Sequence, residues 1–216
     1  MTARFLSVAL DVDSTLCGIE GIDWLAKLRT ADVADQVARA TDRAMSGEIP
    51  LQDLYGHRLT LVAPTRSELK ELSTAYRDTL APNAQREIER WRSAGVTVVL
   101  ISGGLRDAII PMAEELGFAR DSVNALEVEF DEHDAFLRFD NSSPLYTARG
   151  KRTLLSELNL PRPLLAVGDG MTDLAMKDVA DAFAAFTGFA TRDTVVSGAD
   201  YVVSSFTALS EIILGG

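Results

Sequence analysis

The chain has 216 residues and a net charge of −11, with 47% hydrophobic and 25% charged residues. This length suits one domain with at most a small insertion; the composition excludes a disordered chain, and the acidic balance disfavours a nucleic-acid-binding surface. The apolar runs are too short for a membrane helix or an export signal, and Cys17 is the lone cysteine, so we expect a cytoplasmic protein with no membrane partner and no internal disulfide.

Short apolar runs alternate with helical patterns along the chain, which predicts an α/β protein with a doubly wound parallel sheet. Their near-continuous apolar character suits strands that are buried on both faces. The expected strands are residues 5–10, 96–101, 164–167, 182–186 and 201–203. Helices are expected at residues 84–93 and 105–116, each followed by a glycine, and at residues 205–214.

The interval between the first two strands is helical throughout. Residues 18–79 contain helical periodicity and no strand-like run. A capping box at residues 65–68 begins a helix whose Leu69, Leu72 and Tyr76 share one face. So long a stretch exceeds a simple crossover between strands, which predicts an inserted helical cap.

The predicted organisation is therefore a core of residues 1–17 and 80–216 with a cap at residues 18–79. A second, smaller insertion is expected at residues 127–140, where apolar residues alternate with charges in the pattern of a β-hairpin.

Two aspartates, Asp11 and Asp13, follow the first predicted strand directly. Ligands of open α/β sheets bind outside the carboxyl ends of strands, and residues two apart point to the same side. Two carboxylates this close repel each other, and a site that keeps both ionised usually holds a hard cation. The alternative is ordinary turn or capping chemistry, in which aspartate is common.

The second predicted strand ends in Ser102, Gly103 and Gly104. Glycines let backbone amides approach an anion, although glycine turns are also common elsewhere. Lys151 lies in the first turn of a predicted helix, where its charge opposes the helix dipole. That position slightly favours a place beside an anion over the alternative, a solvated surface lysine.

A third strand end carries two more carboxylates. Asp169 and Asp173 lie four residues apart, directly after residues 164–167, and Asp169 has a glycine on either side. Three strand ends thus present acids, an anion-binding turn and acids again. These are the parts of metal-assisted phosphoryl transfer through a covalent aspartyl phosphate.

On these residues the sequence resembles the haloacid-dehalogenase (HAD) superfamily of phosphatases. The four motifs of that superfamily are matched, in order, by Asp11-Val12-Asp13-Ser14-Thr15, Ser102, Lys151 and the pair Asp169 and Asp173. The resemblance covers essentially the whole chain. It implies a HAD-like Rossmannoid core, with the helical cap and the small β-hairpin as insertions.

Within the superfamily the chain is similar to the phosphoserine phosphatase branch. That branch carries a Glu and an Ile-Asp beyond the first motif, as at residues 20–23, then Ala-Met with a small-residue turn, as at residues 44–47, and an arginine, as at Arg58. The chain departs from the branch at Leu51, where a phenylalanine is frequent. A smaller side chain there would loosen or shift the substrate pocket.

The resemblance implies hydrolysis of O-phosphoserine to serine and phosphate through an aspartyl phosphate, with Mg²⁺ as cofactor. Asp11 is the implied nucleophile, and Asp13 the implied general acid and base. The implied Mg²⁺ ligands are Asp11, the Asp13 carbonyl oxygen and Asp169, with Asp173 anchoring waters around the ion.

The implied substrate contacts come from both the core and the cap; they are Thr15, Glu20, Arg58, Ser102, Gly103, Lys151 and Thr172. Ser102, the Gly103 amide and Lys151 would hold the phosphoryl oxygens as charge spreads over them. Glu20 would bind the ammonium group of phosphoserine and Arg58 its carboxylate. The alternative for these two is an exposed surface role.

Three other functions stay open from the sequence. One is a phosphatase for another small phosphomonoester, and another is a phosphotransferase that uses homoserine or a similar alcohol as acceptor. The most distant is a phospho-receiver signalling module, which needs neither the cap nor the second acid pair. The protein is expected to be a monomer or a homodimer.

Overall fold

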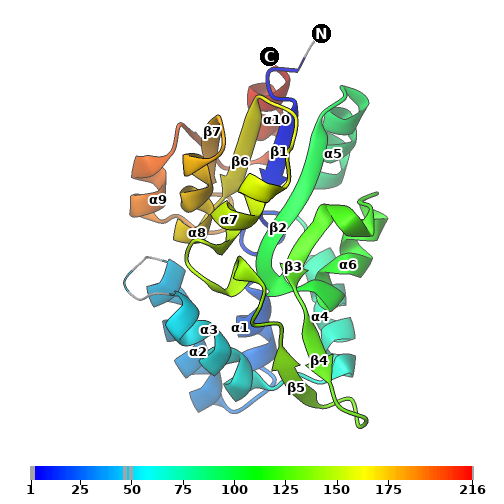
Figure 1. The fold of residues 1–216 in the computed structure, drawn as a ribbon, viewed down its shortest axis with the longest axis vertical. Helices are drawn as coiled ribbons and strands as arrows, with labels where there is room; N and C mark the ends of the chain where they lie inside the picture. The colour runs from blue at the N-terminus through cyan, green and yellow to red at the C-terminus, as the bar shows by residue number, and fades with distance from the viewer. Residues whose placement is uncertain (1–2, 46–47, 49–50, 216) are drawn as a thin grey trace.

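The computed structural model describes residues 3–45, 48 and 51–215. Its core is a six-stranded sheet whose neighbouring strands are all parallel (Figure 1). In spatial order the strands are β3 (Val123–Leu126), β2 (Thr97–Leu105), β1 (Ser7–Leu10), β6 (Leu164–Gly168), β7 (Ala182–Phe186) and β8 (Tyr201–Val203). The predicted α/β fold with a doubly wound parallel sheet is confirmed.

The central strand β1 lies between β2, which carries Ser102, and β6, which is followed by Asp169. Its residues are buried on both faces, as the continuous apolar run predicts. Leu10 pairs with Leu100 on one side and with Val167 on the other. Strands β1 and β6 therefore end side by side, and β2 continues past them to Leu105, so that residues 102–104 lie beside the residues that follow β1.

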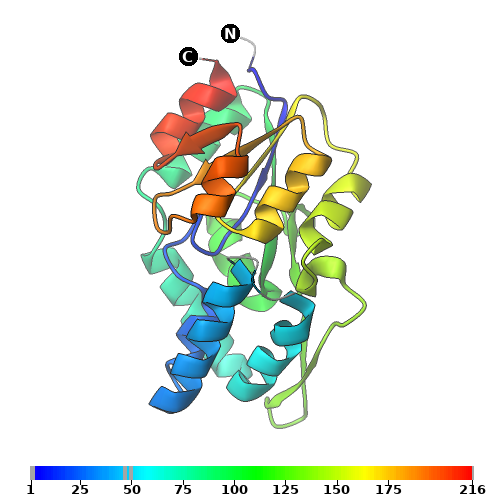
Figure 2. The same ribbon diagram turned by 90° about the vertical axis from the view of Figure 1, so that its left-hand side faces the viewer.

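Helices cover both faces of the sheet. Helices α5 (Ala84–Ser93) and α10 (Phe206–Leu214) pack together on one face, and α7 (Gly150–Glu157), α8 (Met171–Leu174) and α9 (Asp193–Gly198) line the other (Figure 2). Helix α6 (Arg106–Glu115) packs against β3. Three short 3-10 helices are η1 (Arg120–Ser122), η2 (Pro144–Tyr146) and η3 (Ala175–Asp178).

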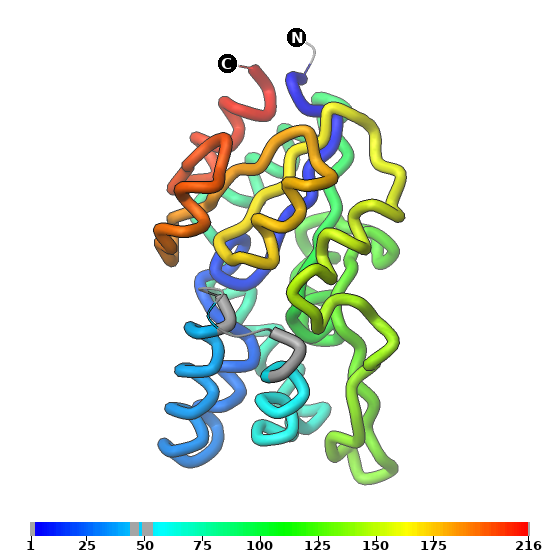
Figure 3. Tube along the Cα trace, turned by 60° about the vertical axis from the view of Figure 1, so that its left-hand side comes forward, coloured from blue at the N-terminus to red at the C-terminus, as the bar shows by residue number. Residues whose placement is uncertain are grey.

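Four helices separate β1 from α5, in the interval predicted as a cap. They are α1 (Gly21–Ala26), α2 (Ala31–Met45), α3 (Leu51–Val62) and α4 (Arg66–Asp78). Helices α1, α2 and α3 pack on one another beyond the carboxyl ends of the strands, at the end of the molecule away from both termini (Figure 3). Helix α4 begins at the predicted capping box, formed by Thr65 and Glu68, and packs mainly against the core helix α6.

The predicted hairpin is formed by β4 (Val128–Phe130) and β5 (Phe136–Phe139). It lies against the cap helices. Arg66 at the start of α4 stacks on the Phe130 ring, 4.7 Å from its centroid, and the Tyr55 ring of α3 lies 5.5 Å from the Phe139 ring. The hairpin thus contacts α3 and α4, two helices of the interval predicted as a cap.

Some elements differ from the prediction. Strand β3 was not predicted, and β2 continues to Leu105, past the expected end at residue 101. Residues 46–47 of the motif at residues 44–47, and the side chains of Ala44, Met45 and Leu51, lie outside what the structure describes. Within the part of the chain that is described, no helix is long and apolar enough to cross a membrane.

Candidate active site

Three aspartates converge where β1 and β6 end. Asp11 follows β1, Asp169 follows β6, and Asp173 lies on the short helix α8. One carboxylate oxygen of each lies within 4.8 Å of the others, and all three side chains are buried. Gly168 permits this approach, because a Cβ there would lie 2.2 Å from the Asp173 carboxyl carbon.

Lys151 of α7 binds two members of this triad. Its Nζ donates to Asp11 Oδ1 at 2.5 Å and to Asp173 Oδ1 at 2.6 Å. Burial alone would lower the pKa of Lys151, but the neighbouring charges of Asp11 and Asp173 outweigh it and raise that pKa. The lysine therefore stays cationic beside Asp11. The predicted interior position beside an anion is found, and the surface alternative is wrong.

The acidic cluster carries more negative charge than the lysine neutralises. Burial and the charge of Asp173 raise the pKa of Asp11 well above its ordinary value, although Lys151 opposes this. Buried carboxylate oxygens that repel one another are the donor set that a hard divalent cation requires. The Asp11, Asp169 and Asp173 side chains therefore fit a metal ion on the chemistry of their donors.

Asp13 is held by donors from two cap helices. Its Oδ1 accepts hydrogen bonds from the Tyr76 hydroxyl at 2.7 Å and from the Gly21 amide at 2.8 Å. Its Oδ2 accepts a longer bond, 3.3 Å, from the Ser102 hydroxyl. Burial raises the pKa of Asp13, and the bonds from Tyr76 and Gly21 oppose that increase.

The glycine-rich turn after β2 differs from the sequence expectation. Residues 102–104 remain extended within β2, with an irregular register toward β3, and α6 begins only at Arg106. Gly104 is required because a Cβ there would lie 2.8 Å from Asp13 Oδ2. Gly103 lines the pocket, and its carbonyl oxygen accepts a hydrogen bond from Tyr55 at 2.7 Å.

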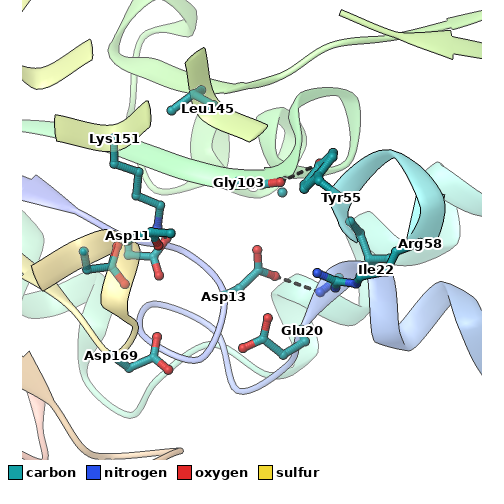
Figure 4. A pocket seen from close by; sticks show the side chains of 14 residues that line it. Asp11, Asp13, Glu20, Ile22, Tyr55, Arg58, Gly103, Leu145, Lys151 and Asp169 are labelled. Atoms are coloured by element: carbon teal, nitrogen blue, oxygen red, sulfur yellow. Dashed lines mark hydrogen bonds and ion pairs between the residues drawn. The ribbon is translucent and has the colours of Figure 1, made fainter. Parts of the chain in front are cut away.

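The interval predicted as a cap supplies an anionic side chain, Glu20, and a cationic one, Arg58, to the pocket. Figure 4 shows Arg58 and Lys151 on opposite sides of it, with Asp13 between them. Arg58 is 3% exposed, and its guanidinium contacts Asp23 Oδ1 at 3.3 Å. Arg58 Nε is buried and has no hydrogen-bond partner. An unpaired buried cationic donor is costly, so a ligand acceptor is expected here.

Glu20 lies directly before α1, opposite the triad. Its carboxylate accepts a hydrogen bond from Ser14 Oγ at 2.7 Å and lies 3.7 Å from the Arg192 guanidinium. Burial and the charge of Asp13 raise the pKa of Glu20 to about 7. A cationic ligand group beside it would favour the ionised carboxylate.

The structure brings most of the predicted site residues to one pocket. Those that line it are Asp11, Asp13, Glu20, Arg58, Gly103, Lys151, Asp169, Thr172 and Asp173. Thr15 and Ser102 are fully buried and act on pocket residues: Thr15 donates to Asp169 Oδ1 at 3.2 Å, and Ser102 Oγ accepts from the Gly104 amide at 2.9 Å.

Sequence reasoning missed several residues of this region, among them Leu145 of η2, which lines the pocket. Tyr55 and Tyr76 come from cap helices, and Arg192 precedes α9 and forms an ion pair with Asp169. None belongs to a motif at a strand end. Only Tyr76 carried a signal, its place on the buried face of its helix, and that signal indicates packing rather than a site.

The profile of the haloacid dehalogenase-like hydrolase family matches residues 8–178. The chain belongs to this family. Among its relatives in the family, phosphoserine phosphatase of Homo sapiens is 33% identical over 94% of this chain and 91% of its own length. The chloroplastic phosphoserine phosphatase of Arabidopsis thaliana is 34% identical over 94% of this chain and 70% of its own length.

Solved structures show the same fold. A phosphoserine phosphohydrolase-like protein from Francisella tularensis superposes with a TM-score of 0.89 at 24% identity, over 99% of this chain and all of that one. A substrate-bound phosphoserine phosphatase superposes with a TM-score of 0.82 at 22% identity, over 97% of this chain and 99% of the other. At these identities the likeness establishes the fold alone, and the family rests on the sequence matches.

Proposed function

We propose that this hydrolase converts O-phosphoserine to serine and phosphate through an aspartyl phosphate on Asp11. The observation that carries the substrate assignment is Arg58, a buried pocket arginine with an unpartnered Nε. Its counterpart is Glu20, the acid on the same pocket. The curated relatives described above carry the name phosphoserine phosphatase and support the same substrate.

The two charged cap residues match the two charged groups of the amino acid. Arg58 would bind the carboxylate, with its fork of N–H donors, and Glu20 would bind the ammonium group. Across the pocket, Lys151, the Gly103 amide and Thr172 would bind the phosphoryl group. Thr15 and Ser102 are buried beneath the pocket lining and would hold Asp169 and the Gly104 amide in place through hydrogen bonds.

Asp11 is proposed as the nucleophile, because its carboxylate lies at the tip of β1 with Lys151 on Oδ1. Asp13 is proposed as the general acid and base, because its Oδ2 lies beside Ser102 and Gly104, next to the segment proposed to bind phosphate. Lys151 would stabilise the charge on the phosphoryl oxygens as the bond to the leaving group breaks.

Mg²⁺ is proposed as the cation of the acidic cluster. Asp11, Asp169 and the Asp13 carbonyl oxygen would hold it, and Asp173 would anchor its waters. When bound, Mg²⁺ supplies positive charge that screens the phosphate from the carboxylate that attacks it. Arg192 already forms an ion pair with Asp169, so this contact would have to rearrange around the ion.

Residues 18–79 are proposed as an inserted cap on a core of residues 1–17 and 80–216. Within the cap, α1, α2 and α3 are the helices suited to move, since α4 packs on the core helix α6. Closure over the pocket would exclude water during transfer to Asp11.

The test is a panel of phosphomonoesters with purified protein and Mg²⁺, in which released phosphate is measured with and without homoserine. Phosphoserine is expected to be the preferred substrate, and homoserine to leave phosphate release unchanged. Arg58→Ala should lower kcat/KM for phosphoserine more than tenfold, because loss of one desolvated charged partner costs about 2–5 kcal/mol. The same variant should leave p-nitrophenyl phosphate nearly unaffected. Equal losses on both substrates would contradict the amino-acid assignment.

A further inference from the structure

Tyr76 reaches the proposed acid and base from outside every motif of the site. It lies on α4, its side chain is fully buried, and its hydroxyl donates to Asp13 Oδ1 at 2.7 Å. Burial and the nearby Asp13 raise the pKa of Tyr76 well above its ordinary value, so the hydroxyl remains a donor. Helix α4 is held by the core helix α6, which makes it a firm support.

Gly21 has no side chain, and this leaves room for the Tyr76 hydroxyl. Its amide donates to the same Asp13 Oδ1 at 2.8 Å. A Cβ on Gly21 would lie 2.2 Å from the Tyr76 hydroxyl oxygen, a distance that forces one of them to move. Any other residue at position 21 would therefore displace Tyr76 from Asp13.

The two donors occupy Oδ1, and among the residues that the structure describes the other carboxylate oxygen, Oδ2, accepts only the longer bond from Ser102. Asp13 Oδ2 lies beside residues 102–104 of β2, 3.3 Å from the Ser102 hydroxyl and close to Gly104. Because Oδ1 already accepts from Tyr76 and Gly21, Oδ2 is the oxygen available to exchange a proton with a ligand.

We propose that Tyr76 is a positioning residue that orients Asp13 so that Oδ2 faces the reacting oxygen. The inference rests on the proposed function. In the first step an Asp11 oxygen bonds to phosphorus, the bond from phosphorus to the serine oxygen breaks, and Asp13 gives that oxygen its proton. In the second step a water oxygen bonds to phosphorus, Asp13 takes a proton from that water, and the bond from phosphorus to Asp11 breaks.

The test compares two leaving groups in Tyr76→Phe, with Tyr201→Phe on the distant strand β8 as the matched control. Serine leaves as a strong base and needs a proton, whereas p-nitrophenolate leaves without one. We expect kcat for phosphoserine to fall about tenfold or more, part of the usual 10²–10⁴-fold effect of a general acid, with KM changed less than about twofold.

With p-nitrophenyl phosphate, transfer to Asp11 should keep its rate within about threefold, while hydrolysis of the aspartyl phosphate slows about tenfold or more. Acid quenching should then trap a larger fraction of the enzyme as phosphoenzyme. Wild-type behaviour of Tyr76→Phe on both substrates would overturn the proposal. So would a parallel loss of transfer, hydrolysis and melting temperature, which indicates a purely structural role.

Gly21→Ala provides an independent arm. It should reproduce the kinetic defect of Tyr76→Phe. The double variant should lose no more activity than Tyr76→Phe alone, because the methyl group added at position 21 then meets no hydroxyl. Additive losses would overturn the proposal. If wild type hydrolyses p-nitrophenyl phosphate but not phosphoserine, the substrate assignment fails, and the p-nitrophenyl phosphate measurements still decide the role of Tyr76.

Discussion

Glu20 has an acid–base property that its proposed role makes measurable. Burial and the charge of Asp13 hold its pKa at about 7 in the ligand-free protein. A protonated Glu20 cannot attract an ammonium group, so phosphoserine should bind less well below that pH. The binding of a substrate without an ammonium group does not depend on the ionisation of Glu20.

We expect the ratio of kcat/KM for phosphoserine to that for p-nitrophenyl phosphate to fall below about pH 7, approaching tenfold per pH unit. Glu20→Gln should lower the ratio at neutral pH and remove its pH dependence. Initial rates from about pH 5.5 to about pH 8.5 would measure this ratio. Catalytic groups that act on both substrates affect both values of kcat/KM, so their titration cancels in the ratio. A ratio that stays flat in wild type would contradict the ammonium contact.

At the residue scale, the convergence of the acids could be predicted from their local positions, whereas Lys151 was indicated mainly by the family resemblance. Asp11, Asp13 and Asp169 directly follow strands, and strand ends meet at one edge of a parallel sheet. Tyr55 and Arg192 could not be predicted in this way. Their placement depends on how α3 and α9 pack against the core, which no local pattern encodes.

At the scale of elements, the helical interval and the hairpin could be predicted from periodicity, but their contacts could not. Strand β3 has the sequence Val-Asn-Ala-Leu, in which Asn124 interrupts the apolar run, so the strand was recognisable only from its pairing with β2. The extension of β2 through residues 102–104 likewise depends on that pairing and on the close approach of Asp13 to Gly104.

The Tyr55 side chain of α3 bonds to the core at the pocket. The Tyr55 hydroxyl donates to the Gly103 carbonyl oxygen, and its ring lies 5.5 Å from that of Phe139 in the hairpin. The hydrogen bond joins the cap to the segment proposed to bind phosphate. If residues 18–79 open as proposed, this bond would have to break.

Tyr55→Phe should therefore weaken closure while it keeps the aromatic packing. Loss of one hydrogen bond, about 0.5–1.5 kcal/mol, predicts a KM for phosphoserine raised about two- to tenfold. Steady-state kinetics would measure this, with Tyr146→Phe as control, since the Tyr146 ring also packs on Phe139. An unchanged KM for Tyr55→Phe would mean that the contact does not hold the closed state.

On the scale of the whole molecule, the site works against the stability of the metal-free fold. Burial raises the pKa values of Asp11, Asp13 and Glu20, so the folded chain binds more protons at these groups than the unfolded chain. Through these three groups the free energy of unfolding falls as the pH rises above the ordinary values of 3.8 and 4.5. The carboxylates whose pKa values are lowered act in the opposite sense, but only near and below those ordinary values. Lys151, whose pKa is raised, stays charged and contributes equally throughout this range.

We therefore expect the melting temperature of the protein, stripped with a chelator, to fall by several degrees from about pH 5 to about pH 8, since 1 kcal/mol shifts it by about 2–4 °C. Mg²⁺ should restore more stability at the higher pH, because a cation binds only the ionised cluster. Asp169→Asn should lose the response to Mg²⁺, because it removes one of the proposed ligands of the ion. Scanning calorimetry of both proteins at each pH measures these shifts. A wild-type melting temperature that rises across this range would show that the buried carboxylates are not the groups that limit stability.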